Sequence, residues 1–324
     1  MIENKRIAAV VPSYRVIAHI KSVISKMPDY IDVIYIVDDK CDQNSGKFVE
    51  DNITDPRVKV IFHKENQGVG GAVITGYRQA IEDNMDIVVK IDGDDQMDPT
   101  LARKFITPIV NGEADYTKGN RFFNFSDASS MPKVRLFGNI ALSFLTKLSS
   151  GYWKTFDPTN GYTAISTAVL KRLALDKIQK RYFFESDILF HLNLVQAKVM
   201  DIPMIAVYGD EISNLKINKI FFPFLKGNLK NFSKRIFYKY FLQDFNVASL
   251  ELIFGISLSL FGTIFGLYHW FVNTGLNVQT PTGTIVVALL PILVGIYLLL
   301  SFLSYDVNNI PSEAISKNLD DKEN

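Results

Sequence analysis

The sequence predicts an α/β domain with a mainly parallel sheet, followed by two helices that span a membrane. In the first two hundred residues, short apolar runs of strand length alternate with segments of helical periodicity, a pattern typical of parallel strands joined by crossover helices. In the C-terminal third the apolar residues are gathered in long runs, although the whole chain is only 48% hydrophobic. A length of 324 residues also exceeds the usual size of one domain.

Four apolar runs in the first hundred residues predict buried strands. They cover residues 7–11, 33–37, 58–62 and 87–91. Three of them end at polar or acidic turns, which read Pro12-Ser13-Tyr14, Asp38-Asp39 and Asp92-Gly93-Asp94-Asp95. Small residues at helical spacing between 66 and 80 predict a helix that packs closely on the sheet. Because ligands bind beyond the carboxyl ends of parallel strands, these turns mark the expected binding site.

The rest of the domain has a less regular pattern. Further strands are predicted at residues 115–120, 162–165 and 199–207, and helices at 134–148, from about 167, and at 183–194. The domain is expected to end near residue 215, where the composition of the chain changes.

Basic and aromatic residues alternate between residues 216 and 243, and no acidic residue interrupts them. This composition suits one or two helices that lie in a membrane interface, with the lysines toward the lipid head groups and the aromatic rings toward the acyl chains. The alternative interpretation is the solvated face of a soluble helix. The apolar segment that follows directly favours the membrane.

Two apolar segments, at about 247–271 and 284–303, are each long enough to cross a hydrocarbon core of roughly 30 Å. Lys and Arg crowd before the first segment and are absent from the connecting loop, so the positive-inside rule leaves both termini in the cytoplasm. A buried helical pair in a soluble protein is the alternative. The predicted organisation is a cytoplasmic domain at 1–215, juxtamembrane helices at 216–246, a transmembrane hairpin at 247–304 and a cytoplasmic tail at 305–324.

Charge and cysteine content narrow the class of protein. The net charge of +1 argues against a protein that binds nucleic acid, which normally carries a clear basic excess. Cys41 is the single cysteine, so no intrachain disulfide can form, and the domain suits a reducing compartment. The N-terminus has no apolar stretch typical of a signal peptide, which also predicts a cytoplasmic domain.

The strongest chemical signal follows the fourth predicted strand. Asp92 and Asp94 are two residues apart, and Gln96 follows after two more. Carboxylate and carboxamide oxygens in this arrangement can bind a hard cation, Mg²⁺ or Mn²⁺. Such a cation would bridge the two phosphates of a nucleotide-sugar and offset the charge on the leaving diphosphate. Alone, the motif is equally typical of an ordinary acidic turn.

The motif occurs in a series that is more specific than any one member. In order, the chain presents Pro12-Ser13-Tyr14, Val37-Asp38-Asp39, Asn66 to Ala72 with Gly76 and Ala80, and the acidic motif. This series resembles the family 2 glycosyltransferases with a GT-A fold. Lys118-Gly119-Asn120-Arg121, Arg135, the segment Asp157 to Tyr162 and the two-helix tail resemble its polyprenyl-phosphate group, which includes dolichyl-phosphate mannose and glucose synthases and their bacterial undecaprenyl counterparts.

The resemblance implies roles for individual residues. The residues expected to bind the nucleotide-sugar are Pro12, Tyr14, Val37, Asp39, Gly68, Asp92 and Gly93. Asp92, Asp94 and Gln96 are expected to bind Mg²⁺ or Mn²⁺, and the expected catalytic set is Asp94, Arg121, Arg135, Glu185 and Asp187. Within that set Arg121 would contact the donor phosphates and Arg135 the acceptor phosphate. The glycines near Gly68 are interpreted as packing positions, because no Lys-Ser or Lys-Thr follows them as in a phosphate-binding loop.

The activity implied is that of a metal-dependent hexosyltransferase of cell-envelope polysaccharide biosynthesis. It would move one sugar, with inversion, from a nucleotide-sugar to a polyprenyl phosphate at the cytoplasmic face of the membrane. UDP-hexose or UDP-N-acetylhexosamine is favoured as donor, because the bacterial members that the chain resembles mostly use these. The expected partners are donor, acceptor and lipid bilayer, with a homo-oligomer packed through the hairpin glycines Gly255, Gly262 and Gly266 as a further expectation.

The role of Glu185 and Asp187 depends on the acceptor. A phosphomonoester has a second pKa of about 6 and needs no base near neutral pH, so these carboxylates would orient sugar hydroxyls or arginines, or serve the fold. If the enzyme instead extends a lipid-linked glycan at a hydroxyl, one of them would remove the acceptor proton. A non-catalytic membrane adaptor with the same fold is a third interpretation.

Two positions depart from the family pattern. Arg15-Val16 follow the first strand where the family often has Asn-Glu, so one acidic contact is missing. Asn214 stands where the family has a lysine that helps to bind phosphate. Lys216 or Lys219 would have to replace that charge.

Overall fold

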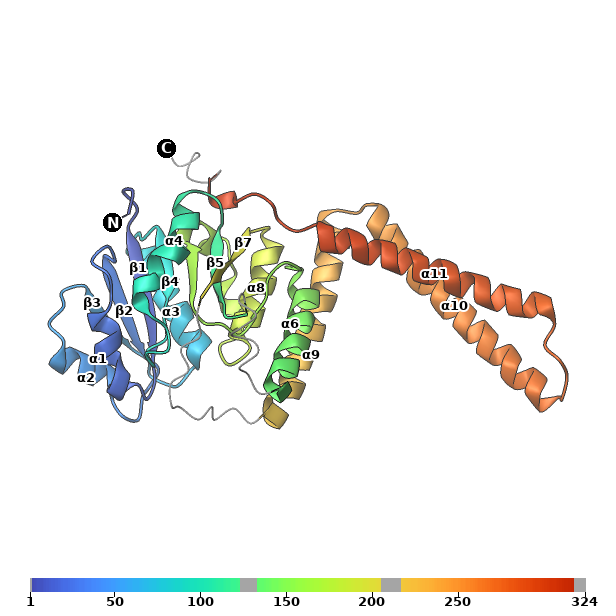
Figure 1. The fold of residues 1–324 in the computed structure, drawn as a ribbon, viewed down its shortest axis with the longest axis horizontal. Coiled ribbons are helices and arrows are strands. Elements are labelled where there is room, and N and C mark those ends of the chain that lie inside the picture. Colours follow the sequence, from blue (N-terminus) through green and yellow to red (C-terminus); the bar gives the residue numbers. More distant parts are fainter. Residues whose placement is uncertain (1, 123–132, 205–216, 318–324) are drawn as a thin grey trace. The chain divides into compact units, whose positions relative to one another are not determined.

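The computed structural model describes residues 2–122, 133–204 and 217–317. The chain divides into two compact units, one made of residues 1–233 and 311–324 and the other of residues 234–310. The first unit is built on one seven-stranded sheet with helices on both faces (Figure 1). The predicted α/β fold is confirmed.

The sheet has the strand order β3-β2-β1-β4-β6-β5-β7. Its strands are β1 (Ile7–Ser13), β2 (Val33–Asp38), β3 (Val58–Phe62), β4 (Ile87–Lys90), β5 (Tyr116–Asn120), β6 (Thr163–Ser166) and β7 (Val199–Pro203). Only β6 runs against its neighbours β4 and β5, and the other pairs are parallel. The sheet is therefore mainly parallel, as predicted.

Helices join the strands of the first unit, and the last helix before the hairpin follows the sheet and ends within the second unit. They are α1 (Ile17–Ser25), α2 (Ser45–Asn52), α3 (Val69–Glu82), α4 (Ala102–Val110), α6 (Lys133–Ser150), α7 (Thr167–Leu170), α8 (Phe184–Leu194) and α9 (Ile217–Phe237), with 3-10 turns at Pro99–Leu101 and Leu175–Lys177. Gly76 lets α3 approach the sheet, because a Cβ at this position would lie 2.5 Å from Val10 Cγ1 on β1. This contact confirms the packing role predicted for the glycine.

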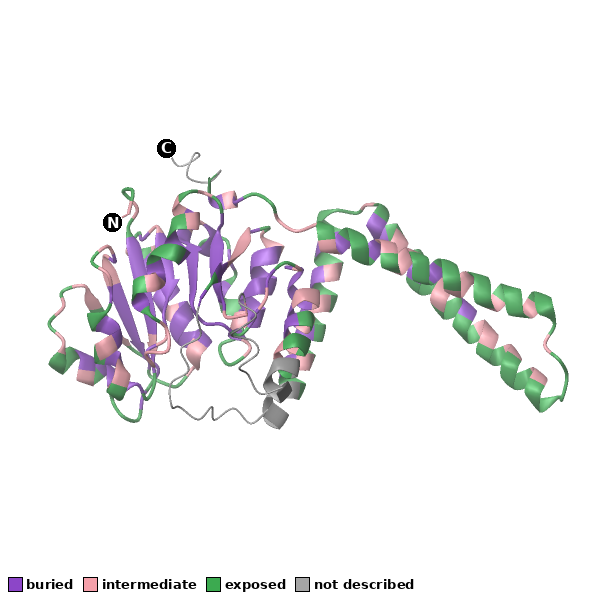
Figure 2. Cartoon of the chain, viewed as in Figure 1, coloured by how far each residue is buried: buried purple, intermediate pink, exposed green. Residues whose placement is uncertain are grey.

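The core of the first unit lies between the sheet and its helices, and Figure 2 shows the central strands buried along their length. The strands β1 and β4 are buried because both faces of the sheet are covered, which explains their continuous apolar sequences. The predicted last strand is shorter than expected: β7 ends at Pro203, and residues 205–207 lie outside the described residues.

The segment after the second apolar helix belongs to the unit that contains the sheet. Its anchor is Asp115, which is fully buried directly before β5. Asp115 Oδ1 accepts the Ser316 N–H at 2.8 Å, and Oδ2 accepts the N–H groups of Ile315 at 3.0 Å and Lys198 at 2.7 Å. One buried carboxylate, directly before β5, thus binds both residues 315–316 and the residue that precedes the edge strand β7.

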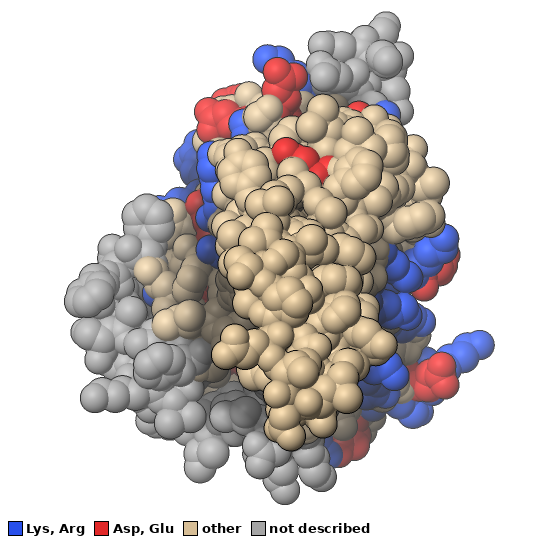
Figure 3. All heavy atoms as spheres, turned by 90° about the vertical axis from the view of Figure 1, so that its right-hand side faces the viewer, with Lys and Arg blue, Asp and Glu red and all other residues tan. Residues whose placement is uncertain are grey.

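The second unit contains an antiparallel helical hairpin, α10 (Val247–Gly275) and α11 (Thr282–Asn308). Both helices are long and apolar enough to cross a membrane, and only 11% of the most apolar window of each is buried. That exposure distinguishes them from the core helices of a soluble protein, and Figure 2 shows both helices mostly exposed. The view in Figure 3 shows a broad uncharged surface, which matches the absence of Lys, Arg, Asp and Glu between residues 252 and 305.

Glycines allow the two hairpin helices to pack closely against each other. A Cβ at Gly255 would meet Leu299 at 2.9 Å, and one at Gly262 would meet the Ala288 carbonyl oxygen at 2.5 Å. These two glycines are therefore occupied by packing within the chain, although they were expected to serve packing between copies. Gly266 also faces α11, where a Cβ would lie 3.1 Å from Ala288 Cβ.

A buried polar cluster joins the start of the second unit to its end. Arg235 donates to both carboxylate oxygens of Asp306, at 2.6 and 2.9 Å, and Tyr240, in the π-helical turn Tyr238–Gln243, donates to the same carboxylate at 2.6 Å. Lys239 donates to the Asn309 carbonyl. Arg235 has no exposed surface. The lysines of 216–243 are expected to face lipid head groups, and this expectation is wrong for Lys239, which makes a buried contact within the chain.

Candidate active site

The carboxyl ends of β1, β2 and β4 meet at one edge of the sheet. Pro12, in β1, pairs with Val37 of β2, and Asp39 follows β2 directly. Tyr14 is the exposed residue of this group, with 42% of its surface accessible. The structure thus brings together the four residues predicted to hold the nucleoside.

The carboxylate of Asp39 organises the loop before α3. Asp39 Oδ1 accepts the Gln67 N–H and Oδ2 accepts the Gly68 N–H, both at 2.7 Å. His63 Nδ1 also lies 2.8 Å from Asp39 Oδ1. Gly68 adopts φ +88°, and a Cβ there would lie 2.7 Å from the Lys180 carbonyl oxygen. Asp39 is therefore engaged with backbone groups, which makes it a support for the site as well as a predicted ligand.

The acidic motif forms the turn after β4. Gly93 places this turn against the end of β1, because a Cβ there would lie 3.2 Å from the Pro12 carbonyl oxygen. Asp94 Oδ1 accepts the Gln96 N–H at 3.1 Å. Asp95 accepts hydrogen bonds from Ser22 of α1 and from Lys26, the residue directly after that helix.

A buried lysine is hydrogen-bonded to the acidic turn. The side chain of Lys90, the last residue of β4, is 1% exposed. Its Nζ donates to Asp92 Oδ1 at 2.7 Å and to the Gly161 carbonyl oxygen at 3.0 Å, and it lies 3.7 Å from Glu185 Oε1. Burial alone would lower the pKa of Lys90, but the charges of Asp92 and Glu185 outweigh it and raise that pKa. Lys90 is therefore a cation at neutral pH.

Glu185 and Asp187 lie in the first turn of α8, and their environments differ. Burial raises the pKa of Glu185, while the neighbouring Lys90 lowers it. Asp187 accepts the Gln179 N–H at 2.7 Å and an amide hydrogen of Asn231 at 2.6 Å, and it lies 3.7 Å from His191 Nε2. These contacts give Asp187 the partners of a structural carboxylate, whereas Glu185 belongs to the Lys90 cluster.

A second ion pair lies at the end of β5. Arg121 donates from Nε to Asp157 Oδ2 and from Nη2 to Asp157 Oδ1, both at 2.7 Å. Burial alone would raise the pKa of Asp157, but the hydrogen bonds and charge of Arg121 outweigh it and lower that pKa. Lys118, also buried, donates to the carbonyl oxygens of Gly119, Phe156 and Asp157. Arg121 is thus held in a fixed orientation by a bidentate pair.

Other predicted residues are only partly described. The backbone of Arg135 lies in the first turn of α6, and its side chain lies outside the described residues. Asn214 and Lys216 lie in residues 205–216, and the side chain of Lys219 lies in α9, also outside the described residues.

The donor set of the acidic turn fits a hard cation that shares its coordination with a ligand. Asp92, Asp94 and Gln96 offer only oxygen atoms to a cation, as Mg²⁺ and Mn²⁺ require. Among residues 2–122, 133–204 and 217–317, no group of three or more His, Cys, Asp or Glu side chains could hold a metal. Two carboxylates and one carboxamide would leave positions for phosphate oxygens and water.

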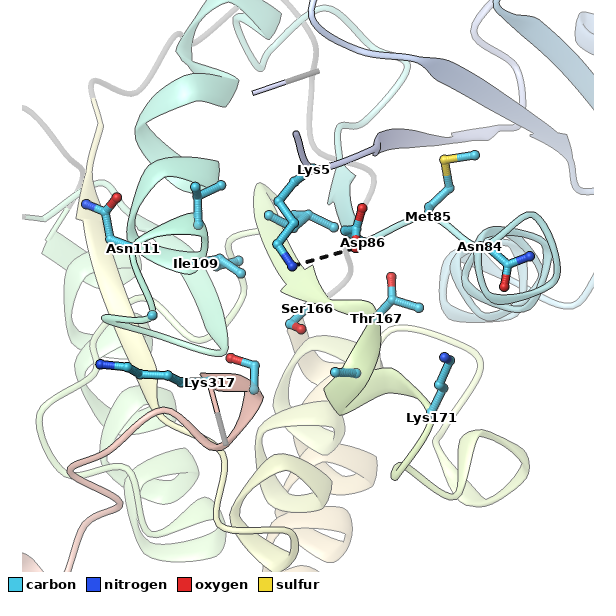
Figure 4. A pocket seen from close by; sticks show the side chains of 15 residues that line it. Lys5, Asn84, Met85, Asp86, Ile109, Asn111, Ser166, Thr167, Lys171 and Lys317 are labelled. Carbon is cyan, nitrogen blue, oxygen red and sulfur yellow. Dashed lines mark ion pairs between the residues drawn. The ribbon is translucent and has the colours of Figure 1, made fainter. Parts of the chain in front are cut away.

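A cavity of about 440 Å³ lies at the opposite end of the strands. Its lining includes Lys5, where Figure 4 shows the ammonium group directed at Asp86, together with Lys317 from the C-terminal segment. Because Lys5 precedes β1 and Ser166 ends the antiparallel β6, this cavity lies at the end of the strands opposite to the end that carries Asp92. It is not part of the candidate active site.

Several residues of the site were missed by sequence reasoning. Lys90 belongs to an apolar strand pattern and Lys118 to a motif, and neither pattern predicts that these lysines are buried in the site. A lysine that interrupts a buried strand one residue before an acidic turn is itself a signal, because an unpaired ammonium group is costly to bury. Asp157 belongs to a segment that carries the family resemblance, but nothing in the sequence indicates its pairing with Arg121.

Comparisons with known proteins identify a family and several relatives. The sequence profile described as Glycosyl transferase family 2 matches residues 10–174. The UDP-N-acetylglucosamine–dolichyl-phosphate N-acetylglucosaminyltransferase of Methanococcus voltae is 33% identical over 221 residues, covering 64% of this chain and 88% of the relative. The undecaprenyl-phosphate mannosyltransferase of Micrococcus luteus is 26% identical over 204 residues, covering 61% of this chain and 82% of the relative.

Among solved structures, the fold is similar to that of glucosyl-3-phosphoglycerate synthase from Mycobacterium tuberculosis, in complex with Mn²⁺, uridine diphosphate and glucosyl-3-phosphoglycerate. The TM-score is 0.51 and the sequence identity 17%, over 72% of this chain and 80% of the other. At this identity the likeness shows the fold.

Proposed function

The chain belongs to glycosyl transferase family 2, and on that premise we propose that it transfers one sugar from a nucleotide-sugar to the phosphate of a polyprenyl phosphate. The observation that carries the proposal is the match to the Methanococcus voltae transferase, of which the chain covers 88%. The name of that relative includes both a UDP-sugar donor and a lipid phosphate acceptor. The Micrococcus luteus relative also carries an undecaprenyl phosphate acceptor in its name.

The favoured donor is a UDP-hexose or UDP-N-acetylhexosamine. Pro12, Tyr14, Val37 and Asp39 would hold the nucleoside at the ends of β1 and β2. When bound at the acidic turn, Mg²⁺ or Mn²⁺ would supply positive charge to the diphosphate. Arg121, fixed by Asp157, would add a second positive group for the phosphates.

The transfer is a single displacement. An oxygen of the acceptor phosphate attacks the anomeric carbon, the bond from that carbon to the nucleoside diphosphate breaks, and the configuration inverts. The acceptor is ionised near pH 7, so no side chain has to remove a proton. The contacts of Asp187 to Gln179 and Asn231 favour a structural role for it and thus support this route. Arg135 would hold the acceptor phosphate.

We propose that the acceptor reaches the site from a membrane. The two apolar helices α10 and α11 would anchor the chain, with the sheet domain and both termini on the cytoplasmic side. Lys226, Lys230 and Lys234 of α9 are exposed, and so is Phe222. These residues suit an interfacial helix that brings the site to the lipid head groups.

The test uses the full chain in detergent with Mg²⁺, undecaprenyl phosphate and a panel of UDP- and GDP-sugars, and it weighs the lipid by mass spectrometry. The expected product is heavier than the acceptor by one sugar with one donor of the panel. A panel that yields no lipid-linked sugar, while a lipid-linked glycan does gain one, would overturn the proposal in favour of a hydroxyl acceptor.

A further inference from the structure

A buried lysine and an aspartate lie side by side on the neighbouring strands β5 and β7. Lys118 of β5 pairs in register with Asp201 of β7, and the two strands are parallel, so both side chains lie on the same face of the sheet. Lys118 is only 1% exposed. Burial lowers its pKa, although the charges of Asp201 and Asp157 act against this. A side chain with so little exposed surface can influence the reaction only through the residues that it contacts.

The two charged groups bind one peptide segment through its carbonyl and N–H groups. The ammonium group of Lys118 donates to the carbonyl oxygens of Phe156, at 2.6 Å, and of Asp157. The carboxylate of Asp201 accepts the Phe156 N–H at 2.7 Å. A third hydrogen bond of Lys118 goes to the Gly119 carbonyl oxygen at 3.3 Å, so its three acceptors match the three N–H donors of an ammonium group. Charged side chains therefore fix the backbone of this segment.

The segment needs this support because Asp157 has an uncommon backbone conformation. Its φ of +53° lies in the left-handed region, which residues other than glycine rarely adopt. Gly119 lets the segment approach β5, because a Cβ there would lie 2.8 Å from Asn160 Nδ2. Asn120 donates to the carboxylate of Asp201 at 3.0 Å. Neighbouring residues at the end of β5 thus serve the same segment.

The conformation of Asp157 determines the orientation of Arg121. The Asp157 carboxylate accepts Arg121 Nε and Nη2, both at 2.7 Å, and also the Arg121 backbone N–H at 3.2 Å. A bidentate pair of this kind fixes the plane of the guanidinium group as well as its position. Any rotation of the carboxylate would therefore turn the guanidinium group with it.

We propose that Lys118 and Asp201 are positioning residues, which hold the backbone of Phe156 and Asp157 and thereby orient Arg121 toward the diphosphate of the donor. This inference rests on the proposed function, in which Arg121 contacts the donor phosphates. Electrostatic stabilisation is most effective when the charged group is already in place before the reaction. Lys118 and Asp201 supply this order from within the sheet, and neither has to touch the substrate.

The test compares the affinities of the full chain for UDP and for uridine, in detergent with Mg²⁺. Isothermal titration calorimetry measures UDP directly and uridine by competition with UDP. Lys118→Met keeps the length of the side chain and removes its three hydrogen bonds. UDP should then bind roughly tenfold more weakly, the loss expected when one hydrogen bond to a charged group is no longer held in place. Uridine has no phosphate, so its affinity should stay the same.

A second substitution shows whether Lys118 acts through Arg121. Arg121→Met should itself weaken UDP binding, and Lys118→Met added to it should weaken that binding by no more than about twofold further. If Lys118→Met does not fold, Asp201→Ala removes the hydrogen bond to the Phe156 N–H and should weaken UDP but not uridine. Lys239→Met is a matched control, because Lys239 is also buried and also donates to a backbone carbonyl, and it should leave both affinities unchanged.

The inference is overturned if Lys118→Met weakens UDP and uridine equally, or if its effect on UDP adds in full to that of Arg121→Met. Weaker UDP binding in Arg121→Met, together with wild-type UDP binding in Lys118→Met, overturns this inference alone. Wild-type UDP binding in Arg121→Met overturns the donor contact of Arg121 as well. The titrations contain no lipid acceptor, so the expected result upholds the inference even if the acceptor proves to be a hydroxyl group.

Discussion

Asp115→Asn should destabilise the sheet domain, because this carboxylate is buried and accepts three backbone N–H groups. Ser316 donates to Oδ1, while Ile315 and Lys198 donate to Oδ2. A carboxamide has one oxygen, so in either orientation its NH₂ group would face at least one of these donors. The substitution keeps the size of the side chain and changes only its charge and its hydrogen bonding.

The expected decrease in the free energy of unfolding can be worked out from these three hydrogen bonds. A hydrogen bond to a charged group contributes about 1.5–3 kcal/mol, against about 0.5–1.5 kcal/mol for a neutral pair. A loss of about 1 kcal/mol for each bond gives a decrease of about 3 kcal/mol in the free energy of unfolding. For a domain of this size, 1 kcal/mol lowers Tm by about 2–4 °C, so the expected decrease is about 6–12 °C.

Thermal unfolding in detergent measures this decrease. The chain has two tryptophans, Trp153 in the sheet unit and Trp270 in α10, so a Trp270→Phe background restricts the fluorescence signal to the sheet unit. Asp51→Asn is a matched control, because Asp51 is an exposed carboxylate paired with Lys47. Its expected decrease in Tm is within about 2 °C, since exposed ion pairs contribute at most about 1 kcal/mol.

Removal of residues 311–324 tests whether the C-terminal segment acts through Asp115. In the truncated chain the Lys198 N–H is the one remaining donor of the three to the Asp115 carboxylate. Asp115→Asn should then lower Tm by only about 2–4 °C. If Asp115→Asn lowers Tm equally in the truncated and the full chain, the contacts to Ile315 and Ser316 contribute nothing, and the reasoning is refuted.

Three more predictions concern the reaction and the hairpin. Asp94→Asn should abolish transfer, as EDTA should, with an unchanged Tm; activity at the wild-type level would remove Asp94 from the cation site. Arg135→Ala should raise KM for the lipid phosphate about tenfold while KM for the nucleotide-sugar stays the same, and an equal rise in both would assign Arg135 to the donor. Gly262→Leu should separate the hairpin helices, because a Cβ already meets Ala288 and Ile292; cysteines placed across the interface should then lose their crosslinking, and retained crosslinking would contradict the packing.

Much of the fold was predictable because each buried strand is a continuous apolar run that ends at a turn. Residues 7–11, 33–37 and 87–91 needed only their composition, since both faces of the sheet are covered. The direction of β6 could not be predicted, because the apolar pattern of a strand does not specify which strands lie beside it or in which direction they run. The docking of residues 315–316 on Asp115 depends on a contact that spans two hundred residues.

The site was predictable as a set of turns and much less as a set of contacts. The spacing of Asp92, Asp94 and Gln96 located the acidic turn. The pairing of Asp92 with Lys90, and the use of Asp39 oxygens by the loop before α3, depend on how separate elements pack. In α9 the basic pattern suggested one exposed face, whereas Arg235 is buried against Asp306 because the chain returns there. Long-range ion pairs of this kind leave no local signal.

The central claim is that the sugar is transferred to a phosphate oxygen, and ³¹P NMR of the reaction mixture tests it most directly. With the full chain, Mg²⁺, the preferred UDP-sugar and a short-chain polyprenyl phosphate, the phosphomonoester signal should convert into a phosphodiester signal at the rate at which UDP appears. Release of UDP while the phosphomonoester signal persists, with the sugar recovered on a hydroxyl group, would contradict the account.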